Sequence, residues 1–290
     1  MRKFLIVSFA AFLVFTGFFL YIKYFYIAST KFQMNYIDIL PRDKGLILIE
    51  DLKSKKIIVN TNPILSKSSF KPGSLIKIIT TFGFLKEKLI TVEDKFKCNG
   101  EMKIFDNNYK CWKFNGHGKE NILDTFSNSC NLFYIKYTDK LGIERFKNYL
   151  KLFGFKLKQN KYFSKKELSD LAIGESPYLY ITPLNALELI SRIAVNKTDN
   201  EMKLVKGALR NTVLRGTAKY LKNFKPEIAG KTGTSTQEGK KSFNQAWFIG
   251  YAPLDDPKIA FVVFVKQGYS FSDAVPMAEK MLRKYFNNNK

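Results

Sequence analysis

A serine and a lysine stand three residues apart at the start of an apolar segment of the chain. Ser74 and Lys77 follow Pro72 and Gly73, and most residues from 75 to 85 are apolar, which predicts a turn leading into a buried helix. The three-residue spacing puts both side chains on one face of that helix. A serine becomes a good nucleophile when a base takes its proton, and a lysine can be that base when burial lowers its pKa. The pair therefore predicts a nucleophile, Ser74, and its base, Lys77.

A second copy of the Ser-x-x-Lys spacing, from Ser68 to Lys71, shows that the pattern alone is weak. The chain is so rich in lysine that a helix start with a solvated lysine explains any single copy. Context distinguishes the two copies, because Ser68 lies in polar surroundings whereas Ser74 begins the apolar segment. Ser74 is the better candidate, and other parts of the chain must support it.

A hydroxyl and an amide stand close together in a second cluster. Ser129 and Asn131 are separated by one residue and lie between two apolar runs that predict helices. At such a junction the serine can relay a proton and the asparagine can hold a substrate amide. The same spacing recurs from Ser242 to Asn244, so this cluster too needs the others.

The third cluster, Lys231-Thr232-Gly233, occurs once in the chain and lies on a predicted strand. A glycine on a strand lets another backbone approach closely, and a lysine with neighbouring hydroxyls can bind a carboxylate. The cluster therefore predicts a place where an extended substrate with a carboxylate end lies along the strand.

The N-terminal end of the chain predicts a membrane anchor. Phe4 to Ile22 contains 19 residues without a charge, or about 28 Å of helix, which is close to the thickness of a bilayer core. Arg2 and Lys3 precede this stretch, and no small-x-small cleavage site follows it. We expect an uncleaved single-pass anchor in the cytoplasmic membrane, with the remainder on the extracytoplasmic (periplasmic) side. The predicted divisions are an anchor, a short connector and one catalytic domain, at residues 1–23, 24–43 and 44–290.

The composition limits the classes of function. With 290 residues, of which 46% are apolar, the chain can bury a full core. The net charge of +23 is spread evenly, and no basic run alternates with stacking aromatic residues. This distribution argues against a nucleic-acid partner.

Predicted strands stand at both ends of the catalytic region and predicted helices lie between them. The strands are residues 45–50, 56–60, 228–235, 245–251 and 258–265, and the helices include 143–153, 182–195 and 273–286. The region with Cys98-Asn-Gly100 and Asn107-Asn108 reads as a loop. An antiparallel sheet built from both ends of one domain and covered by helices gives an α+β fold.

Ser-x-x-Lys, Ser-x-Asn and Lys-Thr-Gly follow one another in the order seen in penicillin-recognising serine enzymes. Over residues 44 to 286 the chain resembles the transpeptidase domain of class B penicillin-binding proteins of the elongation type. The resemblance implies a penicillin-binding-protein/β-lactamase-like fold with a helical subdomain. It rests on the three clusters and on further segments, namely Gly116-His-Gly118, Ala172-Ile-Gly-Glu-Ser176, Ile181-Thr-Pro183, Arg215-Gly-Thr-Ala218 and Ala246-Trp-Phe-Ile-Gly-Tyr-Ala-Pro253.

The resemblance also implies an activity and its residues. The family acylates its serine with the D-Ala-D-Ala end of a peptidoglycan stem peptide, is inhibited by β-lactams, and needs no cofactor for catalysis. Its pattern assigns catalysis to five residues and substrate binding to three more, which here are Ser74, Lys77, Ser129, Asn131 and Lys231, followed by Thr232, Gly233 and Thr234. It further implies a membrane glycosyltransferase as partner. Family members usually carry a large module between anchor and domain, where this chain has about 20 residues.

Other functions compatible with these residues are a D,D-carboxypeptidase, a β-lactamase, and a membrane-anchored β-lactam sensor or scaffold without catalysis. A class A β-lactamase uses for hydrolysis a glutamate followed four residues later by an asparagine, on a loop between the second and third clusters. Glu144 and Asn148 have this spacing but lie inside a predicted helix close behind the second cluster. A scaffold is expected to have lost some of the cluster residues, and all are present.

Three cysteines and the single histidine of the chain lie within 33 residues, at Cys98, Cys111, His117 and Cys130. Three thiolates and an imidazole form a complete tetrahedral zinc set. The alternative is a disulfide between Cys98 and Cys111, with Cys130 a buried free thiol. Some members of the resembled family bind zinc at this place, so the resemblance favours a structural zinc.

Overall fold

The computed structural model describes residues 18, 36–104, 106–159, 162–237 and 243–288. The predicted anchor at residues 1–23 lies outside this part, apart from Phe18. Among the helices described there, none combines the length and the apolar character needed to cross a bilayer.

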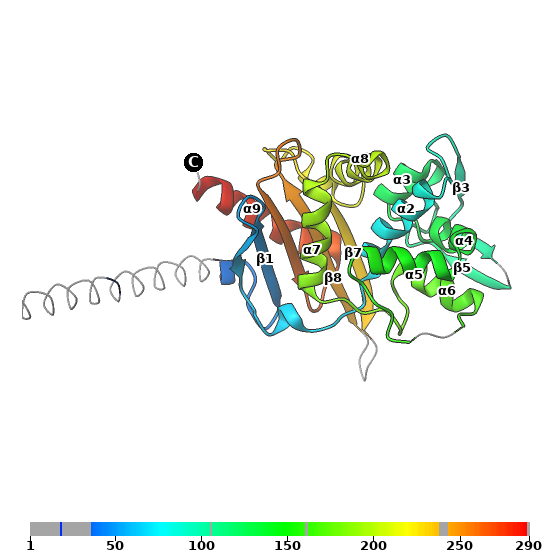
Figure 1. The fold of residues 1–290 in the computed structure, drawn as a ribbon, viewed down its shortest axis with the longest axis horizontal. Helices are drawn as coiled ribbons and strands as arrows, with labels where there is room; N and C mark the ends of the chain where they lie inside the picture. The colour runs from blue at the N-terminus through cyan, green and yellow to red at the C-terminus, as the bar shows by residue number, and fades with distance from the viewer. Residues whose placement is uncertain (1–17, 19–35, 105, 160–161, 238–242, 289–290) are drawn as a thin grey trace, which may run out of the picture.

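A five-stranded antiparallel sheet forms the centre of the molecule (Figure 1). Its strand order is β2-β1-β9-β8-β7, so the N-terminal hairpin joins the three C-terminal strands through the β1–β9 pair. The bounds are β1 Gly45–Asp51, β2 Lys56–Asn60, β7 Ala229–Gln237, β8 Phe243–Ala252 and β9 Ile259–Val265. The two predicted early strands, the three predicted late strands and the α+β class are confirmed.

The helices of the described residues cover the sheet or carry the candidate site residues. The site begins at the 3-10 helix η2 Gly73–Ile76, which continues directly into α2. The α-helices described are α2 Lys77–Lys86, α3 Ile122–Ser127, α4 Asn131–Leu141, α5 Ile143–Leu152, α6 Lys165–Ile173, α7 Pro183–Val195, α8 Asn200–Leu214 and α9 Val275–Asn288.

Alternate residues of each central strand face two separate cores. Leu48 of β1 belongs to the core that contains residues of α2 and α7, whereas Ile49 belongs to the core that contains residues of α9. Figure 1 shows α7 across one face of the sheet, α9 on the opposite face, and helices α2 to α6 gathered beside β7. The strand period of two explains this division, because a strand covered on both faces must be apolar at every position.

Helix α7 illustrates how the local sequence sets an element's bounds. Thr182 accepts a hydrogen bond from the backbone of Asn185, whose side chain returns one to Thr182, and Pro183 occupies the first helical position. This capping box satisfies backbone groups that would otherwise lack partners. The predicted helices at 182–195 and 143–153 are confirmed, each to within one residue, as α7 and α5.

The region expected to be a loop contains two small antiparallel sheets instead. Strands β3 Phe96–Cys98 and β6 Gly118–Glu120 form one, and β4 Glu101–Ile104 and β5 Asn107–Lys110 form the other. The prediction failed because these strands are only three or four residues long, so any alternation of polar and apolar residues in them is too short to indicate a strand.

The segment before β1 packs on the domain. Tyr36 and Leu40 are buried in the core that lies between the sheet and α9. The sequence assigned both residues to a connector because their surroundings show no regular apolar period. Their burial extends the packed unit to Tyr36 at its N-terminal end.

Candidate active site

The segment that carries Ser74 is held between strand β7 and the residues that follow α6. Gly73 has a φ of +51°, and a Cβ on it would lie 2.3 Å from the carbonyl oxygen of Thr234. On the other side the backbone N–H of Gly73 donates to Gly174, whose missing Cβ leaves room for the Gly73 backbone. Two glycines in contact thus bring the half-buried Ser74 to the edge of β7.

Replacing Gly73 with alanine is expected to destabilise the domain by about 2 kcal/mol or more, because the new Cβ meets backbone on β7 and the φ is unfavourable. The urea dependence of unfolding measures this loss. Gly207→Ala is the matched control, since no atom lies within 4 Å of its Cβ position inside α8. That change is expected to stabilise by about 0.5–1 kcal/mol. Equal effects of the two substitutions would contradict the proposed packing.

Lys77 is fully buried at the start of α2 and has three acceptors within hydrogen-bond distance. Its Nζ lies 2.9 Å from the Ser129 carbonyl oxygen, 3.3 Å from Ser129 Oγ and 2.6 Å from Asn131 Oδ1. Burial lowers the pKa of Lys77 to about 8, although Cys130, Cys111 and Glu175 oppose the shift. About a tenth of this lysine is therefore neutral at pH 7, and this form can accept a proton.

The turn that presents Ser129 is a strained junction between α3 and α4. Ser129 has a φ of +55°, which is uncommon for a residue other than glycine. Its backbone N–H donates to Phe126, and the N–H of Cys130 donates to Thr125, so the end of α3 fixes the turn. Asn131 then begins α4, with its side chain directed to Lys77.

Lys231 approaches the same hydroxyl from the sheet. Its Nζ lies 3.2 Å from Ser129 Oγ and 3.1 Å from the carbonyl oxygen of Thr232. Burial and then the charge of Lys77 hold the pKa of Lys231 well below its ordinary value. Ser129 Oγ therefore lies within hydrogen-bond distance of two buried amines, an arrangement that can pass a proton between them.

The hydroxyls of β7 continue the site along the strand. Thr232 Oγ1 hydrogen-bonds Thr217 Oγ1, and Thr234 Oγ1 donates to Ser270 Oγ at 3.1 Å. Gly233 has a different surrounding from the one expected, because its Cβ position faces Leu75 of η2 at 3.0 Å. The absence of a side chain on Gly233 lets β7 pack directly against the segment that carries Ser74.

Three further residues at the site were not identified as functional from the sequence. Thr217 and Ser270 contact the β7 hydroxyls, and the Glu175 carboxylate accepts a hydrogen bond from the backbone N–H of Thr236 at 3.2 Å. Glu175 also lies 4.0 Å from the Lys71 amine. Thr217 and Glu175 stand in segments that carry the family resemblance, which was an available signal. Ser270 lies in none of the segments that carry the resemblance, so no sequence signal marked it.

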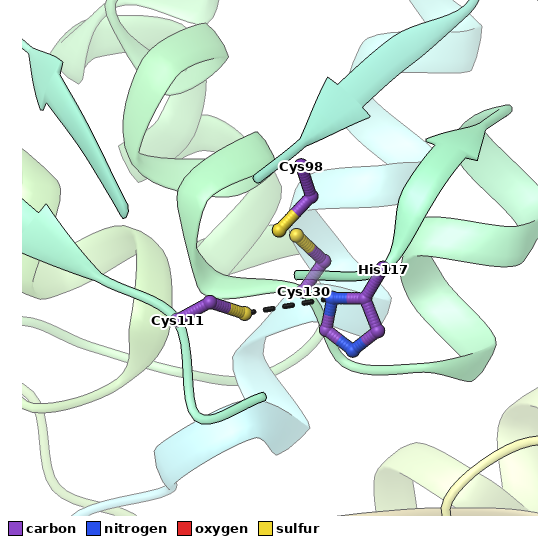
Figure 2. Close-up of side chains that lie close together, drawn as sticks. All are labelled: Cys98, Cys111, His117 and Cys130. Carbon is purple, nitrogen blue, oxygen red and sulfur yellow. Dashed lines mark hydrogen bonds between the residues drawn. The ribbon is translucent and has the colours of Figure 1, made fainter. Parts of the chain in front are cut away.

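The cysteines and the histidine form one cluster beside the Ser129 turn (Figure 2). Their possible ligand atoms all lie within 4.8 Å of one another, and His117 directs Nδ1 to Cys111 Sγ at 3.5 Å. All three cysteines are free, so the alternative of a Cys98–Cys111 disulfide is wrong for this structure. It failed because the fold brings Cys130 to the same point, which sequence spacing does not show.

The thiols of Cys111 and Cys130 shift each other's pKa. A hydrogen bond with Cys130 lowers the pKa of Cys111, and the same bond with Cys111 raises the pKa of Cys130. The lowered pKa favours thiolate at Cys111, and thiolate is the form that binds metal. Three sulfurs and one imidazole nitrogen within 4.8 Å of one another fit the ligand set of a tetrahedral zinc ion.

Three curated relatives are similar to this chain in sequence. Stage V sporulation protein D of Bacillus subtilis is 26% identical over 249 residues, covering 68% of this chain and 38% of that protein. Regulatory protein BlaR1 of Staphylococcus aureus is 26% identical over 83% of this chain and 38% of its own length. Peptidoglycan D,D-transpeptidase MrdA of Haemophilus influenzae is 22% identical over 77% of this chain and 45% of its length. The match thus spans less than half of each relative.

Solved structures share the fold. PBP2 of Pseudomonas aeruginosa, solved with WCK 5153, superposes with a TM-score of 0.75 at 18% identity, covering 86% of this chain and 72% of that one. A chain from a study of polymerization and crosslinking by a peptidoglycan synthase complex gives a TM-score of 0.73 at 21% identity, covering 84% of this chain and 56% of that one.

A family model described as the penicillin binding protein transpeptidase domain matches residues 47–283. The chain therefore belongs to the family of penicillin-binding protein transpeptidase domains.

Proposed function

We propose that this protein is a peptidoglycan D,D-transpeptidase that is acylated at Ser74. The observation that carries the proposal is the convergence of three distant segments on one hydroxyl. Ser129 Oγ lies within hydrogen-bond distance of the amines of Lys77 and Lys231, and Ser74 lies one turn before Lys77. The name of the MrdA relative gives this activity for that protein.

The proposed reaction uses the neutral form of Lys77 as the first base. Lys77 takes the proton of Ser74 as Ser74 Oγ attacks the carbonyl carbon between the two D-alanines. Backbone N–H groups of Ser74 and Thr234 stabilise the oxyanion, each worth about 3 kcal/mol. The C–N bond then breaks, and the leaving D-Ala takes a proton through Ser129.

The acyl ester that results is resolved by an amine of a second stem peptide. The amine nitrogen attacks the ester carbon, the bond to Ser74 Oγ breaks, and a new amide forms the crosslink while a proton returns through Lys77. In this scheme Lys231, Thr232 and Thr234 hold the terminal carboxylate of the donor. The carboxylate's negative charge favours the protonated form of Lys231, which burial alone disfavours.

The activity is tested with a donor peptide that ends in D-Ala-D-Ala, with and without an amine acceptor, using the full chain in membranes or detergent. A transpeptidase releases D-Ala and forms the crosslinked product when the acceptor is present. Release of D-Ala without a crosslink would identify a D,D-carboxypeptidase. Rapid hydrolysis of benzylpenicillin without a lasting adduct would identify a β-lactamase.

A pH profile provides a further prediction. The rate of acylation by benzylpenicillin is expected to rise about tenfold per pH unit below the pKa of Lys77, which is about 8, and to level above it. The sign follows because protonated Lys77 cannot take the proton of Ser74. Intact-mass time courses at several pH values measure the rate, with unfolding curves at each pH as a control. A rate that is constant or falls across this range would contradict the role of Lys77 as base.

The β-lactam sensor left open by the sequence is the second candidate, because a relative named as a regulatory protein, BlaR1, matches 83% of this chain. Both functions predict a stable penicillin adduct. They differ on the natural substrate, since a sensor domain is expected to form the adduct and to release no D-Ala from peptides. The donor assay above therefore separates them.

We also propose that residues 4–22 anchor the domain in the cytoplasmic membrane and that a membrane glycosyltransferase is its partner. The run of 19 uncharged residues supports the anchor, and the fold shared with a chain from a peptidoglycan synthase complex supports the partner. Copurification from detergent with and without residues 1–23 tests both points.

We further propose that Cys98, Cys111, His117 and Cys130 hold a structural zinc ion. The convergence of three free thiols with an imidazole nitrogen supports it. When bound, the metal would fix four segments of chain and supply no chemistry to the reaction. Cys130 lies between Ser129 and Asn131, so the position of both side chains depends on this cluster.

A further inference from the structure

Strand β7 is the edge of the central sheet, and its outer edge faces the segment that carries Ser74. Among the described strands β7 pairs with β8 alone. A Cβ on Gly73 would meet the carbonyl oxygen of Thr234, so this carbonyl points away from β8. In an antiparallel strand the N–H and C=O of one residue point to the same edge, and every second residue repeats that direction. The N–H groups of Thr234 and Thr236 therefore both lie on the outer edge.

The Glu175 carboxylate occupies this outer edge. Its oxygens Oε1 and Oε2 lie 3.3 Å and 3.2 Å from the backbone nitrogen of Thr236, which donates to them. Backbone groups on a sheet edge need a partner that no neighbouring strand supplies, and here a side chain from outside the sheet supplies it. Glu175 is therefore held two residues along β7 from Thr234, whose N–H is the proposed oxyanion donor.

The end of α6 fixes the backbone of Glu175. Gly174 ends the helix with a left-handed φ of +78°, and the N–H of Glu175 donates to the carbonyl oxygen of Asp170 at 2.9 Å. The carbonyl oxygen of Gly174 accepts a hydrogen bond from the N–H of Gly73 at 3.1 Å. Two consecutive residues thus hold the two sides of the site, because Gly174 contacts the Ser74 segment and Glu175 contacts β7.

Lys71 joins the same three parts of the structure. Its buried amine lies 4.0 Å from Glu175 Oε2, and its carbonyl oxygen accepts a hydrogen bond from Ser235 Oγ of β7 at 3.0 Å. The ion pair is long, so the hydrogen bonds to Thr236 are the closer contacts of the carboxylate. Together these contacts hold the Ser74 segment and the outer edge of β7 in one arrangement.

We propose that Glu175 is a positioning residue that fixes the separation between the backbone N–H groups of Ser74 and Thr234. Two donors stabilise one oxyanion only when both point at the same place, and a displacement of about 1 Å can cost about 100-fold in rate. An edge strand has a neighbouring strand on one side only, so its outer edge needs another support. The inference rests on the proposed function, in which Ser74 is acylated and these two groups are the oxyanion donors.

Three variants of the full chain in detergent test this role. Glu175→Ala removes the acceptor for the Thr236 N–H, whereas Glu175→Gln keeps an acceptor oxygen and removes the charge. Glu101→Ala is the matched control, because Glu101 is exposed on β4. Intact mass at several concentrations of benzylpenicillin gives the maximal acylation rate, the concentration for half of that rate, and the fraction of chains that react. Hydrogen exchange at the Thr236 amide is followed by mass spectrometry.

The maximal acylation rate is expected to fall about 10- to 100-fold in Glu175→Ala, while the half-maximal concentration changes less than about threefold. Glu175→Gln is expected to stay within about threefold of the unmodified protein, because its amide oxygen can accept the same hydrogen bond. The Thr236 amide is expected to exchange about tenfold faster in Glu175→Ala. A general loss of structure would instead lower the fraction of chains that react and leave the rate of the folded chains unchanged.

The outcomes separate this inference from the proposed function. An unmodified protein that forms no adduct would overturn the proposed function, and the role of Glu175 with it. An unmodified protein that is acylated, together with a maximal rate in Glu175→Ala within about twofold of Glu101→Ala, would overturn the inference alone. A Glu175→Gln variant as slow as Glu175→Ala, or unchanged exchange at Thr236 in Glu175→Ala, would also overturn it, because the hydrogen bond to β7 would then not be the contact that matters.

Discussion

Replacing Ser74 with alanine is expected to abolish the covalent adduct with benzylpenicillin, reducing the acylation rate on the order of 10⁴-fold or more. The acyl bond forms on this oxygen, and a neighbouring hydroxyl cannot take its place without moving the backbone. Ser74 is held by Gly73 against β7 on one side and by Gly174 on the other. The substitution leaves these contacts intact, so the variant is expected to fold normally.

Intact mass after incubation with the drug measures the adduct. Ser68→Ala is the matched control, because it begins the other Ser-x-x-Lys copy and its hydroxyl donates to the carbonyl oxygen of Ile64 rather than to the site. The control is expected to acylate at the rate of the unmodified protein. An adduct on the Ser74 variant, or its loss on the Ser68 variant, would reject the assignment.

Removal of the proposed zinc is expected to have the second largest effect. A ligand present at about 1,000 times its Kd stabilises the fold that binds it by about 4 kcal/mol. For a domain of this size, losing that stabilisation lowers Tm by on the order of 10 °C. Acylation is expected to slow as well, because Cys130 lies inside the turn that orients Ser129 and Asn131 toward Lys77.

Metal analysis of protein purified without added zinc is expected to give one ion per chain. Cys111→Ser is expected to lose the ion, the Tm increment and most of the acylation rate. Chelation followed by return of zinc controls for damage to the thiols, since it must restore all three properties. Metal-free protein that retains three titratable thiols and the full acylation rate would show that the cluster does not hold a structural zinc ion.

The sequence by itself predicted which residues carry the chemistry, and it identified most of the central elements. Strand and helix periods are local, so the strands of the sheet and the capped helix α7 followed from neighbouring residues. The three clusters are short and ordered, and their order identified the family that the model match later supported. Where strands were only three or four residues long, as in β3 to β6, the local pattern was too short to indicate a strand and the prediction failed.

Only the tertiary structure decided how the clusters act together. Ser129 comes within hydrogen-bond distance of Lys77, 52 residues away, and of Lys231, 102 residues away. The lowered pKa of Lys77 follows from burial by distant segments, and no local pattern of residues contains that burial. The contact of Ser270 with Thr234 arises in the same way. The type of a residue determines which reactions its side chain can take part in. The pKa of that side chain and its distance from other groups determine which of these reactions occurs, and both depend on how the chain packs.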